Sequence, residues 1–352
     1  MNISNILTGW YKKNRRDLPW RETQDPYKIW ISEIILQQTR VNQGISYYYR
    51  FLDHFPNLRS LAKASLDAVL KQWQGLGYYN RARNLHHTAQ YLYNQRNGIF
   101  PDHYSDLIQL KGIGPYTAAA IASFAFKEPV AVVDGNVQRV IARLFEIEEP
   151  VQSGKGKKNI QEIASKLIDK DQPDTHNQAM IEFGAMLCTP QNPSCPDCPL
   201  ASSCGAFKTG RVQELPVKKA AQKKKDRFFY YLVVNDRENR VLLQKRTARD
   251  VWHSLYEFPL IEKKQKMGLD KLTKTNEWNS LLHTFQPEII HISKEYKHIL
   301  SHQNIHAQFI EIKTNSSFPK NPDSFLFVPK DELDQYAVSR LIEKYIEDRE
   351  QE

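Results

Sequence analysis

The stretch Leu110-Lys111-Gly112-Ile113-Gly114-Pro115-Tyr116-Thr117 decides the fold of the first part of the chain. Its two glycines let the backbone turn tightly and approach a ligand closely. Pro115 suits the first turn of a helix, where a backbone N–H is not needed. The free amides at the start of that helix favour an anion. The pattern predicts two helices joined by a hairpin that binds phosphate at Gly112 and Gly114, although an ordinary tight turn can have the same residues.

A candidate carboxylate lies beyond the hairpin, in Val132-Val133-Asp134-Gly135-Asn136-Val137. Asp134 comes just before a stretch with the apolar spacing of a helix, over 136–145. Asp is a common residue at the start of a helix, where its side chain caps free amides. The same position favours an ionised carboxylate. Asp134 can therefore be a helix cap, a charged catalytic group, or both.

A second candidate carboxylate is surrounded by apolar residues, in Trp30-Ile31-Ser32-Glu33-Ile34-Ile35-Leu36-Gln37-Gln38-Thr39-Arg40-Val41. A carboxyl group held among apolar side chains has a raised pKa and can act as an acid. Together with an ionised Asp134, an acidic Glu33 would suit acid-assisted cleavage of a glycosidic bond. The alternative is a solvated or salt-bridged Glu33 on a helix face.

All four cysteines of the chain lie in one short stretch with the spacing Cys-x6-Cys-x2-Cys-x5-Cys. The prolines between them stiffen the loop, so that the sulfurs can converge. Four thiolates suit tetrahedral zinc and suit an iron–sulfur cluster equally well. The spacing alone predicts a metal centre and leaves its identity open. The cysteines are Cys188, Cys195, Cys198 and Cys204.

The pattern of apolar residues divides the chain into two domains. Helices are predicted over 27–43, 61–74, 83–95, 117–126, 136–145, 159–168 and 175–187. The Lys-rich segment 207–226 has no helical pattern and is typical of a linker. Strands are predicted over 228–235, 240–245, 306–313 and 324–328, followed by a helix from Ala337 to Tyr345. We therefore expect an all-α domain over 1–206, a basic linker, and an α+β domain over 227–352.

The positive charge of the chain is concentrated in its first part. Residues 1–225 carry 30 Lys and Arg against 20 Asp and Glu, a net charge of +10, whereas residues 226–352 carry 19 against 20, a net charge of −1. Such a basic domain suits a polyanion such as DNA. No stretch is apolar enough to span a bilayer, and Met1–Trp20 has no signal-peptide core. We expect an intracellular, reducing location, in the cytoplasm or nucleoid.

Several motifs together resemble those of the adenine DNA glycosylases, the MutY family of the helix–hairpin–helix glycosylase superfamily. They are the hairpin followed by Asp134, the apolar segment around Glu33, the cysteine spacing, and the segments Arg16-Asp17-Leu18-Pro19-Trp20-Arg21 and Gly75-Leu76-Gly77-Tyr78-Tyr79. The resemblance covers residues 15–205. It implies an all-α domain that removes adenine from DNA, and it favours a [4Fe–4S] cluster over zinc at the cysteines.

The resemblance also implies roles for single residues. It makes Glu33 the acid that protonates adenine N7. Asp134 becomes the carboxylate that stabilises, or bonds to, the sugar cation, with Tyr116 and Asn136 as its supporting partners. Gln38 and Tyr78 would enter the base stack while adenine is flipped out. The implied positions of the adenine pocket are Arg16, Trp20, Leu36 and Glu182.

Tyr116 discriminates between members of the superfamily. Members that also cut the DNA strand have a lysine at this position, because a Schiff base needs an amine. A phenol cannot form one, so we expect base removal without strand cleavage. The alternatives are a glycosylase of the same fold that acts on oxidised pyrimidines or on thymine in G·T pairs, and a catalytically silent DNA-binding module. Tyr116 argues against oxidised pyrimidines. The pair Glu33 and Glu182, together with the extra C-terminal domain, argues against thymine, and the intact Glu33 and Asp134 argue against a silent module.

The second domain resembles the Nudix class, which in this family reads the oxidised guanine opposite adenine. The segments that carry this resemblance are 251–259 and Leu300-Ser301-His302. The chain has no acidic Nudix hydrolase box, so we expect no pyrophosphatase activity. Ser301 is the candidate contact to 8-oxoguanine, although it can also merely cap a turn. The expected partner is double-stranded DNA with an A:8-oxoguanine or A:G mismatch, bound by a monomer.

Overall fold

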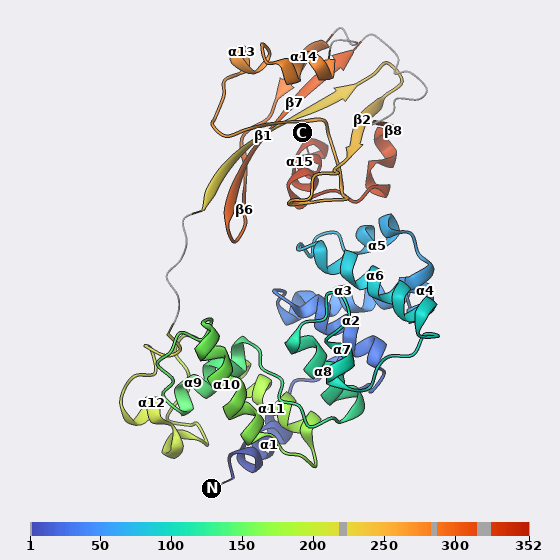
Figure 1. The fold of residues 1–352 in the computed structure, drawn as a ribbon. Coiled ribbons are helices and arrows are strands. Elements are labelled where there is room, and N and C mark those ends of the chain that lie inside the picture. Colours follow the sequence, from blue (N-terminus) through green and yellow to red (C-terminus); the bar gives the residue numbers. More distant parts are fainter. Residues whose placement is uncertain (1, 218–223, 283–286, 315–324, 352) are drawn as a thin grey trace. The chain divides into compact units, whose positions relative to one another are not determined.

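The computed structural model describes residues 2–217, 224–282, 287–314 and 325–351 (Figure 1). The chain divides into two compact units. Unit 1 consists of Met1–Lys63 and Asn84–Ala220, and unit 2 of Ala64–Arg83 and Ala221–Glu352. No helix in the described ranges is both long and apolar enough to cross a membrane.

Unit 1 is built from helices, as the sequence predicts. The predicted helix 27–43 is two helices, because Gln38 takes a left-handed backbone conformation with φ of 61° that ends the first of them. The helices are α1 (Ile3–Asn14), α2 (Pro26–Leu36), α3 (Val41–His54), α4 (Leu58–Lys63), α6 (Asn80–Gln95, which begins in unit 2), α7 (Tyr104–Leu107), α8 (Pro115–Phe126), α9 (Gly135–Leu144), α10 (Gly154–Leu167), α11 (Pro173–Met186) and α12 (Gly205–Lys208), with short 3₁₀ turns at Pro19–Arg21 and Ala201–Ser203.

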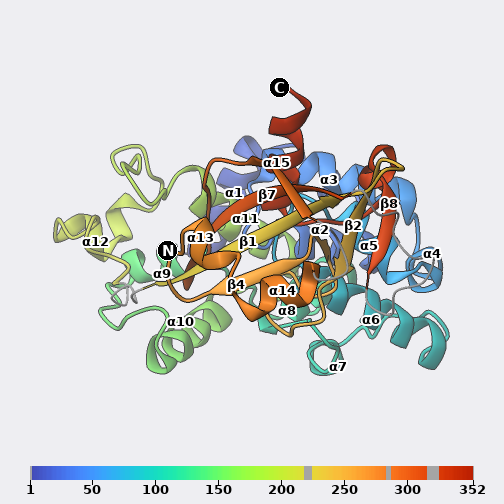
Figure 2. The same cartoon turned by 90° about the horizontal axis from the view of Figure 1, so that it is seen from above.

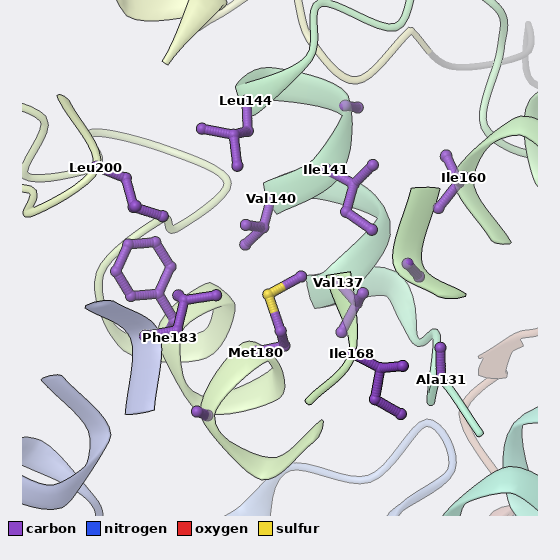
Figure 3. Packing of buried hydrophobic residues seen from close by; sticks show 14 of the residues in the cluster. Ala131, Val137, Val140, Ile141, Leu144, Ile160, Ile168, Met180, Phe183 and Leu200 are labelled. Atoms are coloured by element: carbon purple, nitrogen blue, oxygen red, sulfur yellow. The ribbon is translucent and has the colours of Figure 1, made fainter. Parts of the chain in front are cut away.

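The core between α9, α10 and α11 holds Asp134 and the cysteine loop in place. Figure 3 shows the apolar stripe of α9 facing Met180 and Phe183 of α11. Val137, Val140 and Ile141 of that stripe are buried, as expected for residues spaced three and four apart on one helix face. Burial of each such side chain contributes on the order of 1.5–3 kcal/mol. The start of α9, with its N-cap Asp134, is therefore anchored by packing.

Unit 2 contains an eight-stranded sheet and the short helices around it. Its central strands β1 and β7 lie parallel over their full length, and the predicted hairpin is the antiparallel pair β1 and β2. The strand order is β3-β2-β1-β7-β5, with β4 on β1, β6 on β7 and β8 on β2. The strands are β1 (Lys225–Asn235), β2 (Arg240–Lys245), β3 (Tyr256–Glu257), β4 (Leu260–Lys263), β5 (Pro287–Ile292), β6 (Tyr296–Ile299), β7 (Gln303–Thr314) and β8 (Leu326–Pro329).

Helices cover both faces of this sheet. Figures 1 and 2 show α13 (Leu269–Leu272) and α14 (Asn276–Leu282) on one face and α15 (Arg340–Glu350) on the other. Phe309 of β7 stacks on Tyr345 of α15 with ring centroids 4.0 Å apart, whereas the next residue, Ile310, packs on the face of α13 and α14. The C-terminal helix begins three residues later than predicted, because Val338 forms a β-bridge with Tyr256. The α+β architecture agrees with the prediction.

Two segments group differently from the predicted domain boundaries. Residues 64–83, with α5 (Leu66–Gln72), group with unit 2, where Asp67 accepts hydrogen bonds from Lys245 and from the Tyr256 hydroxyl. Residues 207–217 of the predicted linker pack on unit 1, since Leu215 is buried and its carbonyl accepts a hydrogen bond from Arg143. The remaining linker residues at 218–223 lie outside the described ranges.

Candidate active site

Glu33 is a buried carboxyl group on α2, as the apolar sequence around it predicts. The Tyr116 hydroxyl, on the first turn of α8, donates a hydrogen bond of 2.6 Å to Glu33 Oε2. Burial raises the pKa of Glu33 to about 7, although the Tyr116 hydrogen bond opposes the rise. Burial and the nearby Glu33 charge also raise the pKa of Tyr116 well above 10. Glu33 is therefore partly protonated at neutral pH, as an acid catalyst requires.

Asp134 is the N-cap of α9, and its two carboxylate oxygens accept different hydrogen bonds. The Val137 amide donates to Oδ1 over 2.8 Å, and Asn136 Nδ2 donates to Oδ2 over 2.7 Å. Burial raises the pKa of Asp134 above its ordinary value, although these hydrogen bonds oppose the rise. Asp134 thus caps α9 and accepts a hydrogen bond from Asn136, while the catalytic roles expected for both residues stay predictions. Tyr116, expected beside Asp134, donates its hydrogen bond to Glu33 instead.

Glu182 lies fully buried on α11 and is held by two arginines. Arg16 donates to both carboxylate oxygens from Nε and Nη2, and Arg21 donates to both from Nη1 and Nη2, over 2.6–3.1 Å. Burial raises the pKa of Glu182, but the hydrogen bonds from Arg16 and Arg21 outweigh it and bring the pKa down to about 2. Glu182 is therefore an anion that fixes both guanidinium groups.

A cavity of about 80 Å³ lies next to Glu33 and brings together several predicted pocket residues. Arg16, Trp20 and Leu36 line it, together with Glu33 and Tyr116. Sequence reasoning missed other residues of the lining, which include Arg21, Ser32, Gln178 and Ile181. Gln178 could have been found from its spacing, because it lies one helical turn before Glu182. Arg21 lies in a segment already singled out, but nothing local indicates its pairing with Glu182.

The residues predicted to contact the DNA backbone and base stack lie on loops. Gln38 of unit 1 and Tyr78 of unit 2 are exposed and have positive φ angles of 61° and 47°. Gly112 has a φ of 80°, and a Cβ there would lie 2.5 Å from Asn84, so the hairpin requires glycine. Gly114 is the N-cap of α8. Ser301 lies exposed in the turn between β6 and β7, where its hydroxyl is 3.2 Å from His302 Nδ1.

The four cysteines line a single cavity of about 30 Å³ beside α9. Arg143 donates to Cys188 Sγ over 3.4 Å and to the carbonyl of Thr189 over 2.7 Å, so it holds the start of the loop. Burial raises the pKa of Cys198 to about 11, so its thiolate needs nearby positive charge. Convergent thiols beside a buried guanidinium fit a cationic metal cluster. Within the described ranges, no three Cys, His, Asp or Glu side chains are arranged to hold a single metal ion.

A hydrogen-bonded frame joins the cysteine loop to Asp134. Arg139 donates to the Cys188 carbonyl over 2.7 Å and to Asn136 Oδ1 over 2.8 Å. Asn136 in turn donates to Asp134. Gly184 lets α11 approach this frame, because a Cβ there would lie 2.7 Å from the Asn136 Cβ. The orientation of Asn136 is therefore fixed from both sides.

Comparison with known proteins identifies the family. Residues 31–170 match the HhH-GPD superfamily base excision DNA repair protein model, and residues 230–348 match the NUDIX domain. The adenine DNA glycosylase of Buchnera aphidicola subsp. Baizongia pistaciae is 36% identical over 314 residues, which cover 88% of this chain and 85% of that protein. The chain belongs to the adenine DNA glycosylase family.

Other relatives agree with this assignment. The human adenine DNA glycosylase is 42% identical over 218 residues, covering 59% of this chain and 40% of that protein. A solved thermostable thymine-DNA glycosylase is 28% identical with a TM-score of 0.55, covering 58% of this chain and 95% of that chain. Endonuclease III in a non-covalent DNA complex, at 24% identity and a TM-score of 0.52, shares the fold. The predicted family, fold and enzyme class are confirmed: the chain is an adenine DNA glycosylase of base excision repair.

Proposed function

We propose that this glycosylase hydrolyses the N-glycosidic bond of adenine that lies opposite 8-oxoguanine or guanine, and that it leaves the DNA strand intact. The buried Glu33 carries the proposal, because its pKa of about 7 keeps a proton available at neutral pH beside the cavity. A protonated carboxyl group can donate that proton to adenine N7 and so convert the base into a better leaving group.

Asp134 stabilises the positive charge that develops on the sugar. Its carboxylate has hydrogen bonds from the Val137 amide and Asn136, which favour the charged form despite burial. Glu33 and Asp134 thus divide the acid and the anionic role between them. Tyr116 orients the Glu33 carboxyl through its 2.6 Å hydrogen bond. Its phenol provides no amine, so no Schiff base forms and strand cleavage is absent.

The cavity beside Glu33 receives the flipped adenine. Trp20 and Leu36 supply apolar and aromatic walls on which a base can stack. Arg16 and Arg21 supply the polar boundary of the pocket, and Glu182, which does not itself line the cavity, holds both of them in place. Gln38 and Tyr78 enter the base stack from exposed loops, and the hairpin at Gly112 and Gly114 binds a backbone phosphate through its amides.

A [4Fe–4S] cluster held by Cys188, Cys195, Cys198 and Cys204 is the proposed metal centre. When bound, the cluster crosslinks the loop and contributes positive charge that offsets the buried thiolates. Its role is structural, because thiolates at every iron leave no position open for a substrate. The loop in turn holds Arg139 and thereby Asn136.

The C-terminal domain reads the base opposite adenine, with Ser301 at the contact. A serine hydroxyl both donates and accepts, so it can meet the N7–H and O8 groups that distinguish 8-oxoguanine from guanine. Its exposed position in the β6–β7 turn leaves it accessible. We retain 1–206, 207–226 and 227–352 as the functional division into glycosylase domain, linker and reading domain, and we propose that a monomer acts in the cytoplasm or nucleoid.

The test is a single incubation of purified protein with duplexes that differ in one pair. Adenine opposite 8-oxoguanine and adenine opposite guanine should be excised, whereas adenine opposite thymine should remain. A duplex with thymine opposite guanine in the same sequence tests for release of thymine, the activity in the name of the solved thymine-DNA glycosylase. Release of thymine without release of adenine would overturn the proposal.

A further inference from the structure

The N-terminal helix α1 contributes a side chain that reaches the adenine pocket indirectly. Tyr11, buried on α1, has its hydroxyl 2.6 Å from Oε1 of Gln178, which lines the cavity beside Glu33. The Arg21 guanidinium lies over the Tyr11 ring, 5.5 Å from its centroid. The Ser4 hydroxyl and His176 Nδ1, 2.7 Å apart, fix α1 against α11 at a point two turns before Tyr11. The helix lies outside residues 31–170, over which the glycosylase model matches.

The hydrogen bonds around Tyr11 determine which end of the Gln178 amide faces the cavity. The Tyr11 hydroxyl has a single proton, which it donates to Gln178 Oε1 over 2.6 Å. Because Oε1 of the Gln178 amide accepts from Tyr11, the Nε2 end of the same amide points away from Tyr11. The structure gives Nε2 no hydrogen-bond partner among the described residues.

We propose that Tyr11 is a positioning residue of the adenine pocket, which fixes the Gln178 amide so that its NH₂ group faces the base as a donor. Adenine presents the ring-nitrogen acceptor N7 beside its N6 amino donor, so an amide held with its NH₂ group toward the ring nitrogen complements that acceptor. Without the Tyr11 hydroxyl, the amide can rotate and present its oxygen, which ring nitrogens would repel. The inference rests on the proposed adenine pocket.

The experiment measures adenine excision in single turnover, with enzyme in excess over a duplex that carries adenine opposite 8-oxoguanine. Tyr11→Phe should lower the rate constant about five- to tenfold, the effect expected from one hydrogen bond of about 1 kcal/mol. Affinity for a duplex with cleavage-resistant 2′-fluoro-2′-deoxyadenosine should fall less. Tyr27→Phe is the matched control, because Tyr27 is a buried tyrosine of the same unit whose hydroxyl donates to the Phe55 carbonyl, away from the cavity.

A double-mutant cycle distinguishes positioning from general stability. If Tyr11 acts through Gln178, Tyr11→Phe should change the rate constant less than twofold in a Gln178→Leu background. Gln178→Glu should impair excision more than Tyr11→Phe, since neither end of a carboxylate donates. The inference would be overturned if the effects of Tyr11→Phe and Gln178→Leu on the rate constant simply multiplied in the double variant. Equal rate losses in Tyr11→Phe and Tyr27→Phe would overturn it as well. A wild-type protein that excises no adenine would instead overturn the proposed function.

Discussion

At the scale of single residues, the site depends on two carboxylates with different surroundings. Glu33 has a hydrogen bond from Tyr116, and burial raises its pKa to about 7. Asp134 has hydrogen bonds from a helix-terminal amide and from Asn136, both of which oppose the rise that burial causes. Burial therefore keeps a proton on Glu33 near neutral pH, while at Asp134 hydrogen bonds to the charged form offset part of the same effect.

The acid role of Glu33 predicts the effect of Glu33→Gln. The amide keeps the shape of the side chain but has no proton to donate, so excision should fall by at least the roughly 10²–10⁴-fold that general acid catalysis supplies. Binding to DNA that contains the mismatch should persist. The measurement is single-turnover excision, with duplex affinity as the control. Near-normal turnover would show that Glu33 is not the acid.

The raised pKa of Glu33 also predicts how activity and stability depend on pH. Excision needs the protonated form, so the rate should fall as pH rises through about 7. A carboxyl whose pKa is higher in the folded chain than in the unfolded chain favours folding at low pH. That contribution to stability is lost as the pH rises from the pKa of the unfolded chain to about 7, the pKa of Glu33 in the folded chain. Glu33→Gln should therefore raise the melting temperature at pH 8 and change it little at pH 4.

A further residue-scale prediction concerns the product. Because Tyr116 supplies a phenol and no amine, excision should leave an abasic site that breaks only after hot alkali. Borohydride, which traps Schiff bases, should give little covalent protein–DNA complex. Gel analysis of one reaction, before and after alkali treatment, compares the strand breaks that the enzyme makes with those that alkali makes at abasic sites. Efficient trapping would reveal an amine nucleophile elsewhere in the site.

The sequence predicted the site residues whose surroundings are local and missed those defined by distant partners. Apolar neighbours on both sides of Glu33 indicated its burial, and the position of Asp134 before a helix indicated its capping bonds. Arg21 and Gln178 have no such local signal. Arg21 meets Glu182 across 161 positions, and Tyr11 meets Gln178 across 167. Only the folded chain brings these pairs together.

At the scale of elements, apolar periodicity predicted helices with one well-defined buried face, whereas it merged or missed several other helices. It located α9 within one residue, because this helix buries a regular stripe, and it located α8, which is buried without a break from Thr117 to Ser123, within two residues. It joined α2 and α3, since the left-handed turn at Gln38 interrupts the backbone without interrupting the apolar pattern. It missed α1, a mostly polar helix that buries only Ser4, Leu7 and Tyr11.

The cysteine loop supplies an element-scale prediction. The purified protein should be brown and contain about four irons per chain. The chain has no cysteine outside this loop, so visible absorption reports on the loop alone. Cys198→Ser should lose the colour and lower the melting temperature, because Arg139 and Arg143 would lose the ordered carbonyls that they bind. A colourless wild-type protein that holds one zinc ion would contradict the cluster.

At the scale of the whole molecule, charge and chemistry are divided between the two parts of the chain. The net charge of +10 over residues 1–225 suits the domain that holds DNA, and the near-neutral remainder suits a local test by hydrogen bonds. Adenine is a normal base, so an enzyme that removes it needs such a test of the opposite base. In the function proposed above, the domain over 227–352, joined through the basic linker, makes this test.

This division predicts the result of removing residues 226–352. The truncated enzyme should retain some excision, because Glu33 and Asp134 remain, but should lose much of its preference for adenine opposite 8-oxoguanine over adenine opposite guanine. The measurement is the ratio of single-turnover rates on the two duplexes, with thermal unfolding as a check that the remaining chain folds. Ser301→Ala in the full chain should change the ratio only by the factor that corresponds to about 1 kcal/mol of free energy, since one neutral hydrogen bond is lost. If a folded, truncated enzyme kept the full preference, the N-terminal domain would have to read the opposite base itself.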